Sequence, residues 1–370
     1  MRLCLVRCSA PGDIIQTYPA VAEIRQLYPD ALLHWVVDSR YRSLVERHPQ
    51  VDAAIPIDFQ RFKANPTGEW RKCLHTLREH QYDIAIDLQG NVKSGLITLA
   101  LRSTHKIGYD RSGVSEWPNL LCTRMRCHVP QDLSRRDAYR SLVLQALGSD
   151  EEESAMPQIP LLTLDAEEED ALQRLLSGSL FIENAPILVS PGSRWTNKEL
   201  RIEDLASLLK GIQLRHSASF GVLWGAEREK ILAQELQMMM PELSLLPRLS
   251  LPLLQHLMHH SSLFIGMDSM PLHLAASAGT PTYAFFGPTK ASIYGPQGAG
   301  NLSFQGACPY QEPFERRCPK LRTCSTGACL KTCHFDAERE CEKIDRLLLK
   351  RSGAGNERRD LAEIGDRAPD

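Results

Sequence analysis

The first 37 residues, MRLCLVRCSAPGDIIQTYPAVAEIRQLYPDALLHWVV, contain one complete strand, helix and strand pattern. The apolar run Leu3–Cys8 predicts a buried strand and Ser9–Asp13 a loop with glycine and proline. Ile14–Tyr28 predicts a helix with apolar residues at helical spacing, and Leu32–Val37 the next strand. Strand, helix and strand in this order are typical of a parallel sheet with helices on both faces. The chain therefore begins with a doubly wound α/β unit.

The same alternation continues through most of the chain and restarts once. Strands at Ala53–Ile57, Ile84–Asp87 and residues 106–108 extend the first unit, and five strands between Ile187 and Phe285 predict a second. An acidic, proline-containing stretch between them predicts a linker. The expected divisions are a first domain at 1–150, a linker at 151–160, a second domain at 161–300, a cysteine-rich segment with a helix at 301–351, and a disordered tail at 352–370.

Composition excludes several classes of protein. With 43 Lys and Arg against 45 Asp and Glu, the formal charge of the 370 residues is -2, so no global basic field would attract nucleic acid. The apolar start at Leu3 is interrupted by Arg7 and is too short for a secretion signal, and no apolar run reaches the roughly 18 residues of a membrane span. We therefore expect a cytoplasmic protein whose 11 cysteines do not form structural disulfides.

Six of the cysteines lie close together near the C-terminus. The spacing of Cys318, Cys324, Cys329 and Cys333 would allow a four-thiolate structural Zn or Fe site. Other residues of the same stretch are alternative ligands, namely Cys308, Cys341 and His334. Reduced thiols without metal and a disulfide are the other interpretations of this cluster.

Two motifs of the first half follow expected strands, where doubly wound units bind their ligands. Asp13 ends the SAPGD loop, and helix capping and catalysis explain a carboxylate there equally well. The segment DLQGNVKSG, Asp87–Gly95, offers Gln89 and Lys93 to a hydroxyl-rich or phosphorylated ligand, although capping of the next helix explains it too. A basic group follows the third strand and consists of Arg61, Lys63, Arg71 and Lys72, which would bind anions or form a solvated face.

Two motifs of the second half suit phosphate binding. SPGSRWTNK, residues 190–198, has glycine, hydroxyl groups and Lys198 after a strand. In GMDSMPLHLAASAGTP, residues 266–281, a diphosphate could rest on a helix N-terminus beside Asp268, with His273 donating to it or simply packed in the core. The spacings GxxxxGK and GxGxxG after a strand are absent, which argues against a P-loop NTPase and a dehydrogenase.

Together these motifs resemble a known family. SAPGD, DLQGNVKSG, PGSRWTNK, LWGAERE and MDSMPLHLAASAGTPTYAFFGPT are similar, in order and spacing from Met1 to about Gly300, to the ADP-heptose:lipopolysaccharide heptosyltransferases of glycosyltransferase family 9. The DxQGxxKS form is most like heptosyltransferase I. The resemblance implies a GT-B fold, with two Rossmann-like domains facing a central cleft, the first on the acceptor side and the second binding a nucleotide sugar.

The resemblance also implies an activity and site residues. Heptose would pass from ADP-heptose to the 3-deoxy-octulosonate of lipid A with inversion, Asp13 being the general base, without a required cofactor and at the inner membrane surface. Acceptor contacts would come from Arg61, Lys63, Gln89 and Lys93. Donor contacts would come from Ser193, Arg194, Lys198, Glu229, Leu249, Asp268, Ser269, Met270 and His273.

One departure from the family pattern concerns the donor. The family usually has Thr-Gly where this chain has Ser269-Met270, and the following Pro271 has no backbone N–H for a phosphate. Two alternatives therefore stay open. One is a related transferase that uses another nucleotide sugar or acceptor, and the other is a nucleotide-sugar-binding protein without turnover.

Overall fold

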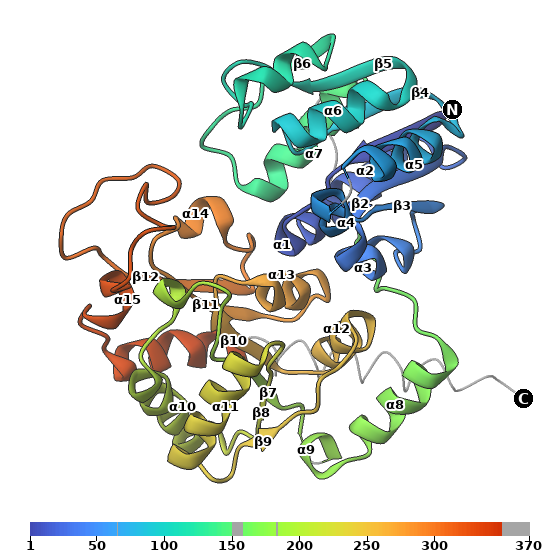
Figure 1. Ribbon diagram of the computed structural model, residues 1–370. Coiled ribbons are helices and arrows are strands. Elements are labelled where there is room, and N and C mark those ends of the chain that lie inside the picture. The colour runs from blue at the N-terminus through green and yellow to red at the C-terminus, as the bar shows by residue number, and fades with distance from the viewer. Residues whose placement is uncertain (65, 150–157, 183, 350–370) are drawn as a thin grey trace, which may run out of the picture. The chain divides into compact units, whose positions relative to one another are not determined.

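The computed structural model describes residues 1–64, 66–149, 158–182 and 184–349 (Figure 1). These residues form two compact units. The first contains Met1–Leu172, Leu249–His256 and Ser292–Tyr294, and the second contains Gln173–Arg248, Leu257–Ala291 and the described residues from Gly295 onward. Most of the expected linker at 151–160 and all of the expected tail at 352–370 lie outside the described residues.

The first unit is built on a parallel sheet of six strands in the order β3-β2-β1-β4-β5-β6. The central strand β1 pairs with β2 and β4, with Leu5 opposite Trp35 and Ile86. Because a central strand is covered on both faces, its sequence is a continuous apolar run. The strands are β1 (Arg2–Val6), β2 (Leu32–Asp38), β3 (Ala53–Ile57), β4 (Gln81–Asp87), β5 (Arg102–Tyr109) and β6 (Met125–Cys127).

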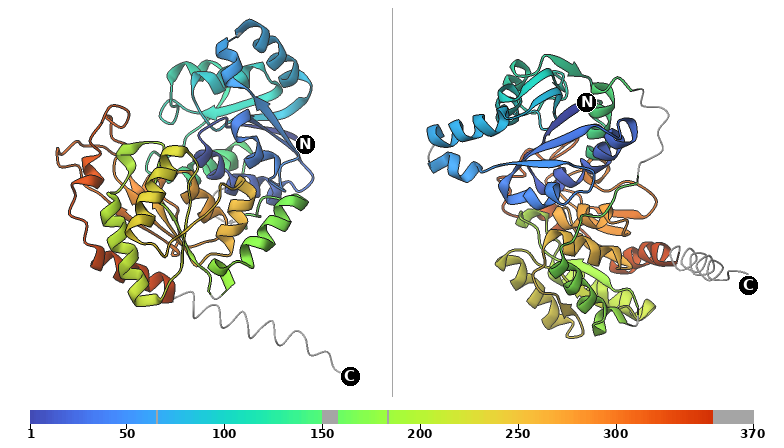
Figure 2. Two further views of the ribbon diagram at one scale, coloured as in Figure 1. Left: turned by 60° about the horizontal axis from the view of Figure 1, so that its bottom comes forward. Right: turned by 90° about the vertical axis from the view of Figure 1, so that its right-hand side faces the viewer.

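Helices cover the first sheet. Cys4 and Val6 pack with Leu77 of α5 and Ile97 of α6, whereas Leu5 points to the opposite face because successive strand residues alternate. Helix α2 packs against α7, and α4 lies beside α5 (Figure 2). The helices are α1 (Pro11–Ile15), α2 (Tyr18–Leu27), η1 (Ser39–Tyr41), α3 (Arg42–Glu46), α4 (Phe59–Ala64), α5 (Pro66–Arg78), α6 (Val92–Ala100), η2 (Trp117–Leu121) and α7 (Arg135–Ala146).

The single helix expected at 14–28 is divided in the structure. Helix α1 ends at Ile15 and α2 begins at Tyr18, with Thr17 as its N-cap residue. The physical reason is Pro19, which has no N–H to donate and is favoured in the first turn of a helix. As a result Asp13 lies in the first turn of its own short helix, α1.

The second unit contains another parallel sheet of six strands, in the order β12-β11-β10-β7-β8-β9. Val189, Ile265 and Phe285 of its three middle strands belong to one buried cluster with Leu205 and Leu209 of α10. The strands are β7 (Ile187–Ser190), β8 (Phe220–Val222), β9 (Ser244–Leu245), β10 (Leu263–Met267), β11 (Thr282–Phe286) and β12 (Asn301–Gln305). The helices between residues 166 and 331 are α8 (Ala166–Leu176), α9 (Ser179–Ile182), η3 (Thr196–Lys198), α10 (Ile202–His216), α11 (Glu227–Met239), α12 (Leu251–His259), α13 (Met270–Ser277), α14 (Ala291–Tyr294) and α15 (Ala328–Lys331).

The stretch expected as a separate segment at 301–351 belongs to the second unit. Its first residues form β12, which pairs with β11, and residues 337–349 form a helix. Leu330, Ile344 and Leu347 join the core cluster of the second sheet. The sequence NLSFQ is short and half polar, as suits an edge strand, so its pattern did not signal a sixth strand.

Gly306, which follows β12, lies very close to the backbone of Cys329, and a mutation can test how tight this packing is. A Cβ added at Gly306 would lie 1.9 Å from the carbonyl oxygen of Cys329, whereas a Cβ at Gly300 would meet no heavy atom within 4 Å. We expect Gly306→Ala to lower the free energy of unfolding of the second unit by about 1–3 kcal/mol, because overpacking forces the backbone to shift. Urea denaturation followed by tryptophan fluorescence measures it, with Gly300→Ala as the control. Equal midpoints for both variants would show that the approach is not tight.

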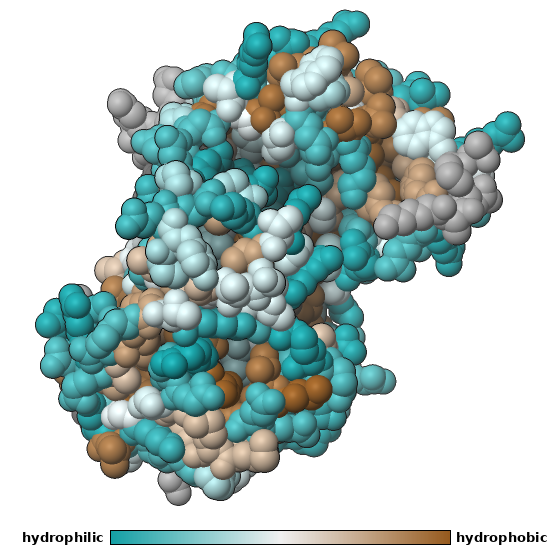
Figure 3. All heavy atoms as spheres, turned by 60° about the vertical axis from the view of Figure 1, so that its left-hand side comes forward, coloured by the Kyte–Doolittle hydropathy of each residue, from teal (hydrophilic) through white to brown (hydrophobic). Residues whose placement is uncertain are grey.

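The surface is predominantly hydrophilic in the view of Figure 3, with hydrophobic residues in separate patches. Such scattered apolar groups are normal for a folded domain. Among the described residues, no helix has the length and apolar character needed to cross a membrane.

Candidate active site

The side chain of Asp13 has three partners. Its Oδ2 pairs with Nη2 of Arg7 at 2.6 Å and accepts a long bond from the N–H of Ala10 at 3.3 Å, and its Oδ1 accepts from the Tyr139 hydroxyl at 2.9 Å. The bond from Ala10 is a helix-capping interaction, so the capping interpretation holds in part. The Asp13 side chain is nevertheless 24% exposed. It is therefore oriented by its neighbours and still reachable by a ligand.

Two cations determine the charge state of Asp13. Burial raises the pKa of its carboxyl group, but Arg7 and then Arg135 lower it, as does the Tyr139 hydrogen bond, and the result is a pKa of about 2. Arg7 is itself buried, donates to the carbonyl of Leu88 at 3.0 Å and lies over the Tyr139 ring, 4.9 Å from its centroid. Asp13 is consequently ionised at neutral pH and able to accept a proton.

Gln89 connects the loops that follow β1 and β4. Its Oε1 accepts from the N–H of Cys8 at 2.8 Å and of Ser9 at 3.3 Å, and the residue is buried. These bonds fix the loop that leads into Asp13. A direct contact between Gln89 and an acceptor stays a prediction.

The carboxylate of the neighbouring Asp87 accepts hydrogen bonds mainly from residues of its own motif, DLQGNVKSG. Its Oδ1 accepts from the N–H groups of Gln89 and Gly90 at 2.9 and 3.0 Å, and its Oδ2 accepts from Ser94 Oγ at 2.9 Å and Asn119 Nδ2 at 2.6 Å. Burial raises the pKa of Asp87 despite these bonds. Gly90 has a φ of 69°, which favours glycine. The contacts support the structural interpretation of DLQGNVKSG.

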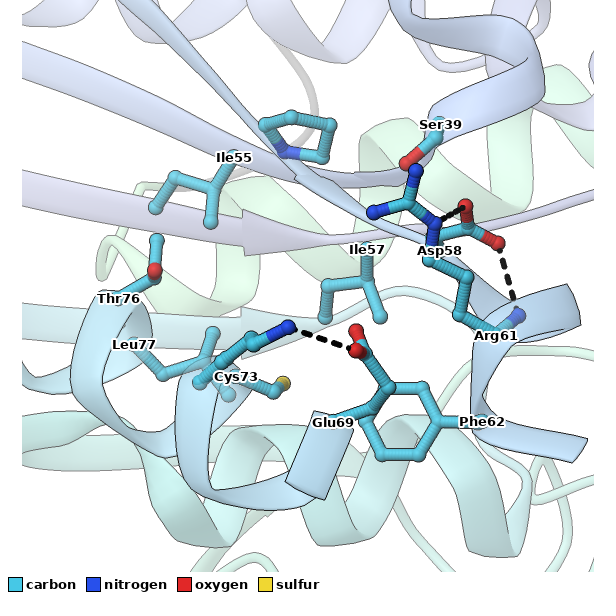
Figure 4. A pocket seen from close by; sticks show the side chains of 12 residues that line it. Ser39, Ile55, Ile57, Asp58, Arg61, Phe62, Glu69, Cys73, Thr76 and Leu77 are labelled. Carbon is cyan, nitrogen blue, oxygen red and sulfur yellow. Dashed lines mark hydrogen bonds and ion pairs between the residues drawn. The ribbon is translucent and has the colours of Figure 1, made fainter. Parts of the chain in front are cut away.

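A cavity of about 340 Å³ lies at the carboxyl end of β3, between α4 and α5 (Figure 4). Arg61 and Lys72 of the expected basic group line it, but each has an acidic partner. Arg61 Nε lies 3.3 Å from Asp58, and Lys72 Nζ lies 3.0 Å from Glu69. Because both cations are largely exposed, these pairs are weak and a ligand anion can compete for them. The side chain of Lys63 lies outside the described residues.

Two further basic residues of the first unit are exposed. Lys93 lies above the ring of Phe59 in α4, with Nζ 3.5 Å from the ring centroid. This contact brings Lys93 to the helix that carries Arg61. Arg71 lies on the exposed surface of α5.

In the second unit, three adjacent strands place polar side chains around Asp268. Asp268 directly follows β10, and its Oδ2 accepts from Lys198 Nζ and from Thr289 Oγ1, each at 2.5 Å. Lys198 ends η3, after β7, and Thr289 follows β11. The carboxyl ends of neighbouring parallel strands are where doubly wound sheets bind ligands. The structure thus brings Lys198 and Asp268 together, while their contacts with a donor stay predictions.

The loop before Lys198 is held by an ion pair. Ser193 donates its N–H to Glu199 Oε1 at 2.9 Å, and Arg228 of α11 pairs with Glu199 and donates to the carbonyl of Ser193. A Cβ at Gly192 would lie 2.7 Å from Cγ of Glu229, so only glycine lets the loop pass this close to α11. The loop is thus held by contacts with Glu199, Arg228 and α11.

The other expected donor residues have mixed surroundings. Oε2 of Glu229 accepts from the N–H groups of Gly225 and Ala226 at 2.9 and 3.1 Å, which caps α11. Ser269 is the N-cap residue of α13, Met270 begins the helix, and His273 is buried one turn further. Arg194 is exposed, whereas Leu249 is half-buried and belongs to the first compact unit. The ligand contacts of these residues stay predictions.

The cysteines group differently from the expected metal site. All 11 are free thiols. Four of them line one cavity of about 30 Å³, namely Cys308, Cys318, Cys324 and Cys329. Cys333 instead points its thiol to the carbonyl of Leu330 at 3.3 Å, at the end of α15. Within the described ranges, no group of three or more His, Cys, Asp or Glu side chains could hold a metal ion. The structure therefore does not support the site expected at Cys318, Cys324, Cys329 and Cys333.

Sequence reasoning missed several residues around the carboxylates. Thr289 had a local signal, since it ends the FFGPT loop after a strand. Arg7 lies inside the first apolar run, and Arg135 and Tyr139 lie in a helix without a recognisable motif. Only the fold brings these three residues to Asp13.

Comparison with known proteins gives relatives along most of the chain. It is 28% identical over 327 residues to lipopolysaccharide heptosyltransferase 1 of Pseudomonas aeruginosa, covering 86% of this chain and 87% of that protein. It is 24% identical over 313 residues to lipopolysaccharide heptosyltransferase 1 of Escherichia coli K12, covering 82% and 92%. These relatives match the resemblance to heptosyltransferase I.

Solved structures share the fold. The E. coli heptosyltransferase WaaC with ADP has a TM-score of 0.69 at 23% identity, covering 83% of this chain and 94% of that one. A glycosyltransferase family 9 protein from Veillonella parvula has a TM-score of 0.74 at 20% identity, covering 94% and 97%. The expected GT-B class, with two doubly wound units, is thereby confirmed. Since the family model "Glycosyltransferase family 9 (heptosyltransferase)" matches residues 70–322, more than half of the chain, the protein belongs to that family of glycosyltransferases.

Proposed function

We propose that this protein transfers heptose from ADP-heptose to a 3-deoxy-octulosonate residue of the lipopolysaccharide inner core, with inversion at the anomeric carbon. The acceptor hydroxyl attacks the anomeric carbon, the bond from that carbon to the β-phosphate oxygen breaks, and ADP leaves. The hydroxyl proton passes to Asp13. The observation that carries the proposal is the Asp13 carboxylate, which is ionised, oriented by Arg7 and Tyr139, and partly exposed.

The donor side supports the same reaction. A transition state resembling an oxocarbenium ion leaves negative charge on the departing ADP. Lys198, the N-terminus of α13 and His273 would meet this charge, and Asp268 would bind heptose hydroxyls. The proposal assigns the leaving-group charge to these groups and includes no metal or other cofactor. A related protein, WaaC of E. coli, has been solved with ADP-2-deoxy-2-fluoro heptose, which supports the choice of donor.

The basic residues expected on the acceptor side support an anionic substrate. Arg61, Lys63 and Lys93 would contact phosphates or carboxylates of the core, and Arg61 borders the cavity at β3. Because lipid A is anchored in a membrane, we place the reaction at the cytoplasmic surface of the inner membrane. Nucleic acid has no role in the proposal.

The test is an assay of the purified protein with ADP-heptose and a heptose-free lipid A core acceptor. ADP release is followed together with the acceptor mass. We expect one ADP for each heptose added. UDP- and GDP-sugars, each with the same acceptor, are the matched controls. Release of UDP or GDP from those sugars, without ADP release from ADP-heptose, would replace the donor assignment. Donor binding without transfer to any core acceptor would favour the binding-protein alternative.

A further inference from the structure

Arg135 is a second cation beside Asp13 that has no acidic partner of its own. It begins α7, one helical turn before Tyr139, so both side chains lie on the same face of the helix. In the part of the chain that the structure describes, Arg135 forms no ion pair, and its buried Nε has no hydrogen-bond partner. A guanidinium without an anion in a partly buried place is unfavourable. An anion from outside the chain would give the Arg135 guanidinium its missing partner.

The charges around Asp13 do not balance. Arg7 and Arg135 are both cations, and the carboxylate that acts on both of them is that of Asp13. The oxygens of Asp13 are already taken by Arg7, Tyr139 and the N–H of Ala10. One positive charge is therefore left beside the proposed base. A wholly neutral acceptor would give that charge no partner.

The position of Arg135 leaves its hydrogen-bond donors available. Its guanidinium lies over the ring of Tyr294, in the same compact unit, with 5.6 Å to the ring centroid. Stacking uses the flat face of a guanidinium and leaves its N–H edge for an anion. The residue is half-exposed, so the end of its side chain can be reached. A carboxylate matches the geometry of this edge, as a phosphate does.

We propose that Arg135 binds the carboxylate of the sugar acid that receives the heptose, next to Asp13, and so selects an acidic acceptor. This inference rests on the proposed function, because it assigns a residue to the acceptor of that reaction. The inference also gives separate roles to the two arginines near Asp13. Arg7 orients the base, whereas Arg135 orients the substrate.

Binding of the acid would also change the base. Arg135 is one of the groups that lower the pKa of Asp13. A substrate carboxylate on Arg135 would offset that effect and add negative charge nearby, so the pKa of Asp13 would rise. Asp13 would then become a stronger base only when the correct acceptor is in place.

The experiment compares two acceptors that differ in one group, the free acid of the core acceptor and its carboxamide. For the wild-type protein at saturating ADP-heptose, we expect kcat/KM to be roughly 10- to 100-fold higher for the acid, as charge-assisted hydrogen bonds predict. Arg135→Met should remove this preference, lowering kcat/KM for the acid while leaving that for the amide nearly unchanged. Arg135→Lys should keep part of it.

The control is Arg136→Met, which removes the same charge one residue further, where Arg136 pairs with Asp137 at 3.2 Å. It should keep the preference for the acid. An equal loss for both acceptors in Arg135→Met would mean a merely structural role, and an unchanged preference would also overturn the inference.

A binding measurement separates this inference from the proposed function. Calorimetric titration of the free sugar acid and its amide needs no turnover. If the wild-type protein transfers no heptose but binds the acid better than the amide in an Arg135-dependent way, the reaction is misassigned and the anion site stands. If transfer occurs and Arg135→Met does not alter the discrimination, the site is misassigned and the reaction stands.

Discussion

Asp13→Asn should lower kcat for heptose transfer roughly 10²- to 10⁴-fold, the usual contribution of a general base. The amide has the size of the carboxylate and can still accept from the Tyr139 hydroxyl, but it cannot take the acceptor proton. The KM for ADP-heptose should change little, because the proposed donor contacts come from other residues. Steady-state ADP release, with the acceptor mass as a second readout, measures both quantities.

The control for Asp13→Asn is Asp30→Asn, the same chemical change at an exposed position of the first unit. Arg7 loses its counter-ion in the Asp13 variant, so the thermal midpoint of both variants must be recorded and the assay run well below it. A folded Asp13→Asn protein with near wild-type kcat would rule out Asp13 as the base. In kcat/KM for the acceptor, which reports the pKa of the free protein, wild type should show no acid limb from Asp13 above about pH 4, since the pKa of Asp13 without acceptor is about 2.

Lys198→Met should lower kcat/KM for the donor roughly 10²- to 10³-fold, as removal of one group that stabilises developing charge does. The cation lies 2.5 Å from Asp268, in the strand-end cluster that also contains Thr289. We expect it to exchange part of this pairing for the phosphates of the departing ADP. Initial rates over a range of ADP-heptose concentrations, at saturating acceptor, give the value.

Lys210→Met is the matched control for Lys198→Met, since Lys210 is an exposed lysine of α10 in the same unit. Lys198→Arg separates charge from packing, because it keeps the cation and should retain more activity than the Met variant. If the Met variant is folded and its kcat/KM for ADP-heptose is unchanged, Lys198 does not meet the leaving-group charge. A loss confined to the KM for the acceptor would move Lys198 to the other substrate.

The fold was predictable because its signals are local. Each central strand is a short apolar run, such as Leu3–Cys8 or Leu263–Gly266, and each is followed by a polar or glycine-containing loop. Asp13 and Asp268 were predicted as site residues in the same way, because strand-end positions in doubly wound sheets face the ligand. Two edge strands, β6 and β12, gave no comparable signal, although the other two edge strands, β3 and β9, were predicted. β12 is only partly buried, so its composition does not differ from that of a loop.

The partners of the predicted residues could not be inferred from the sequence. Tyr139 is separated from Asp13 by 126 positions, and nothing in α7 distinguishes it from an ordinary packed tyrosine. Gln89 shows a second limit of prediction from the sequence. Its motif was recognised, but the sequence could not tell a ligand contact from the two backbone bonds by which it supports the loop before Asp13.

The helix at 337–349 has a practical meaning for anyone who shortens this protein. Its Ile344 and Leu347 fill the core of the second unit, and its Glu340 accepts a buried hydrogen bond from the hydroxyl of Tyr283 in β11. The family model ends at residue 322, before this helix begins. A fragment trimmed to that boundary would expose apolar strands and leave the Tyr283 hydroxyl without an acceptor. Versions made for expression or crystallisation should therefore extend at least to residue 349.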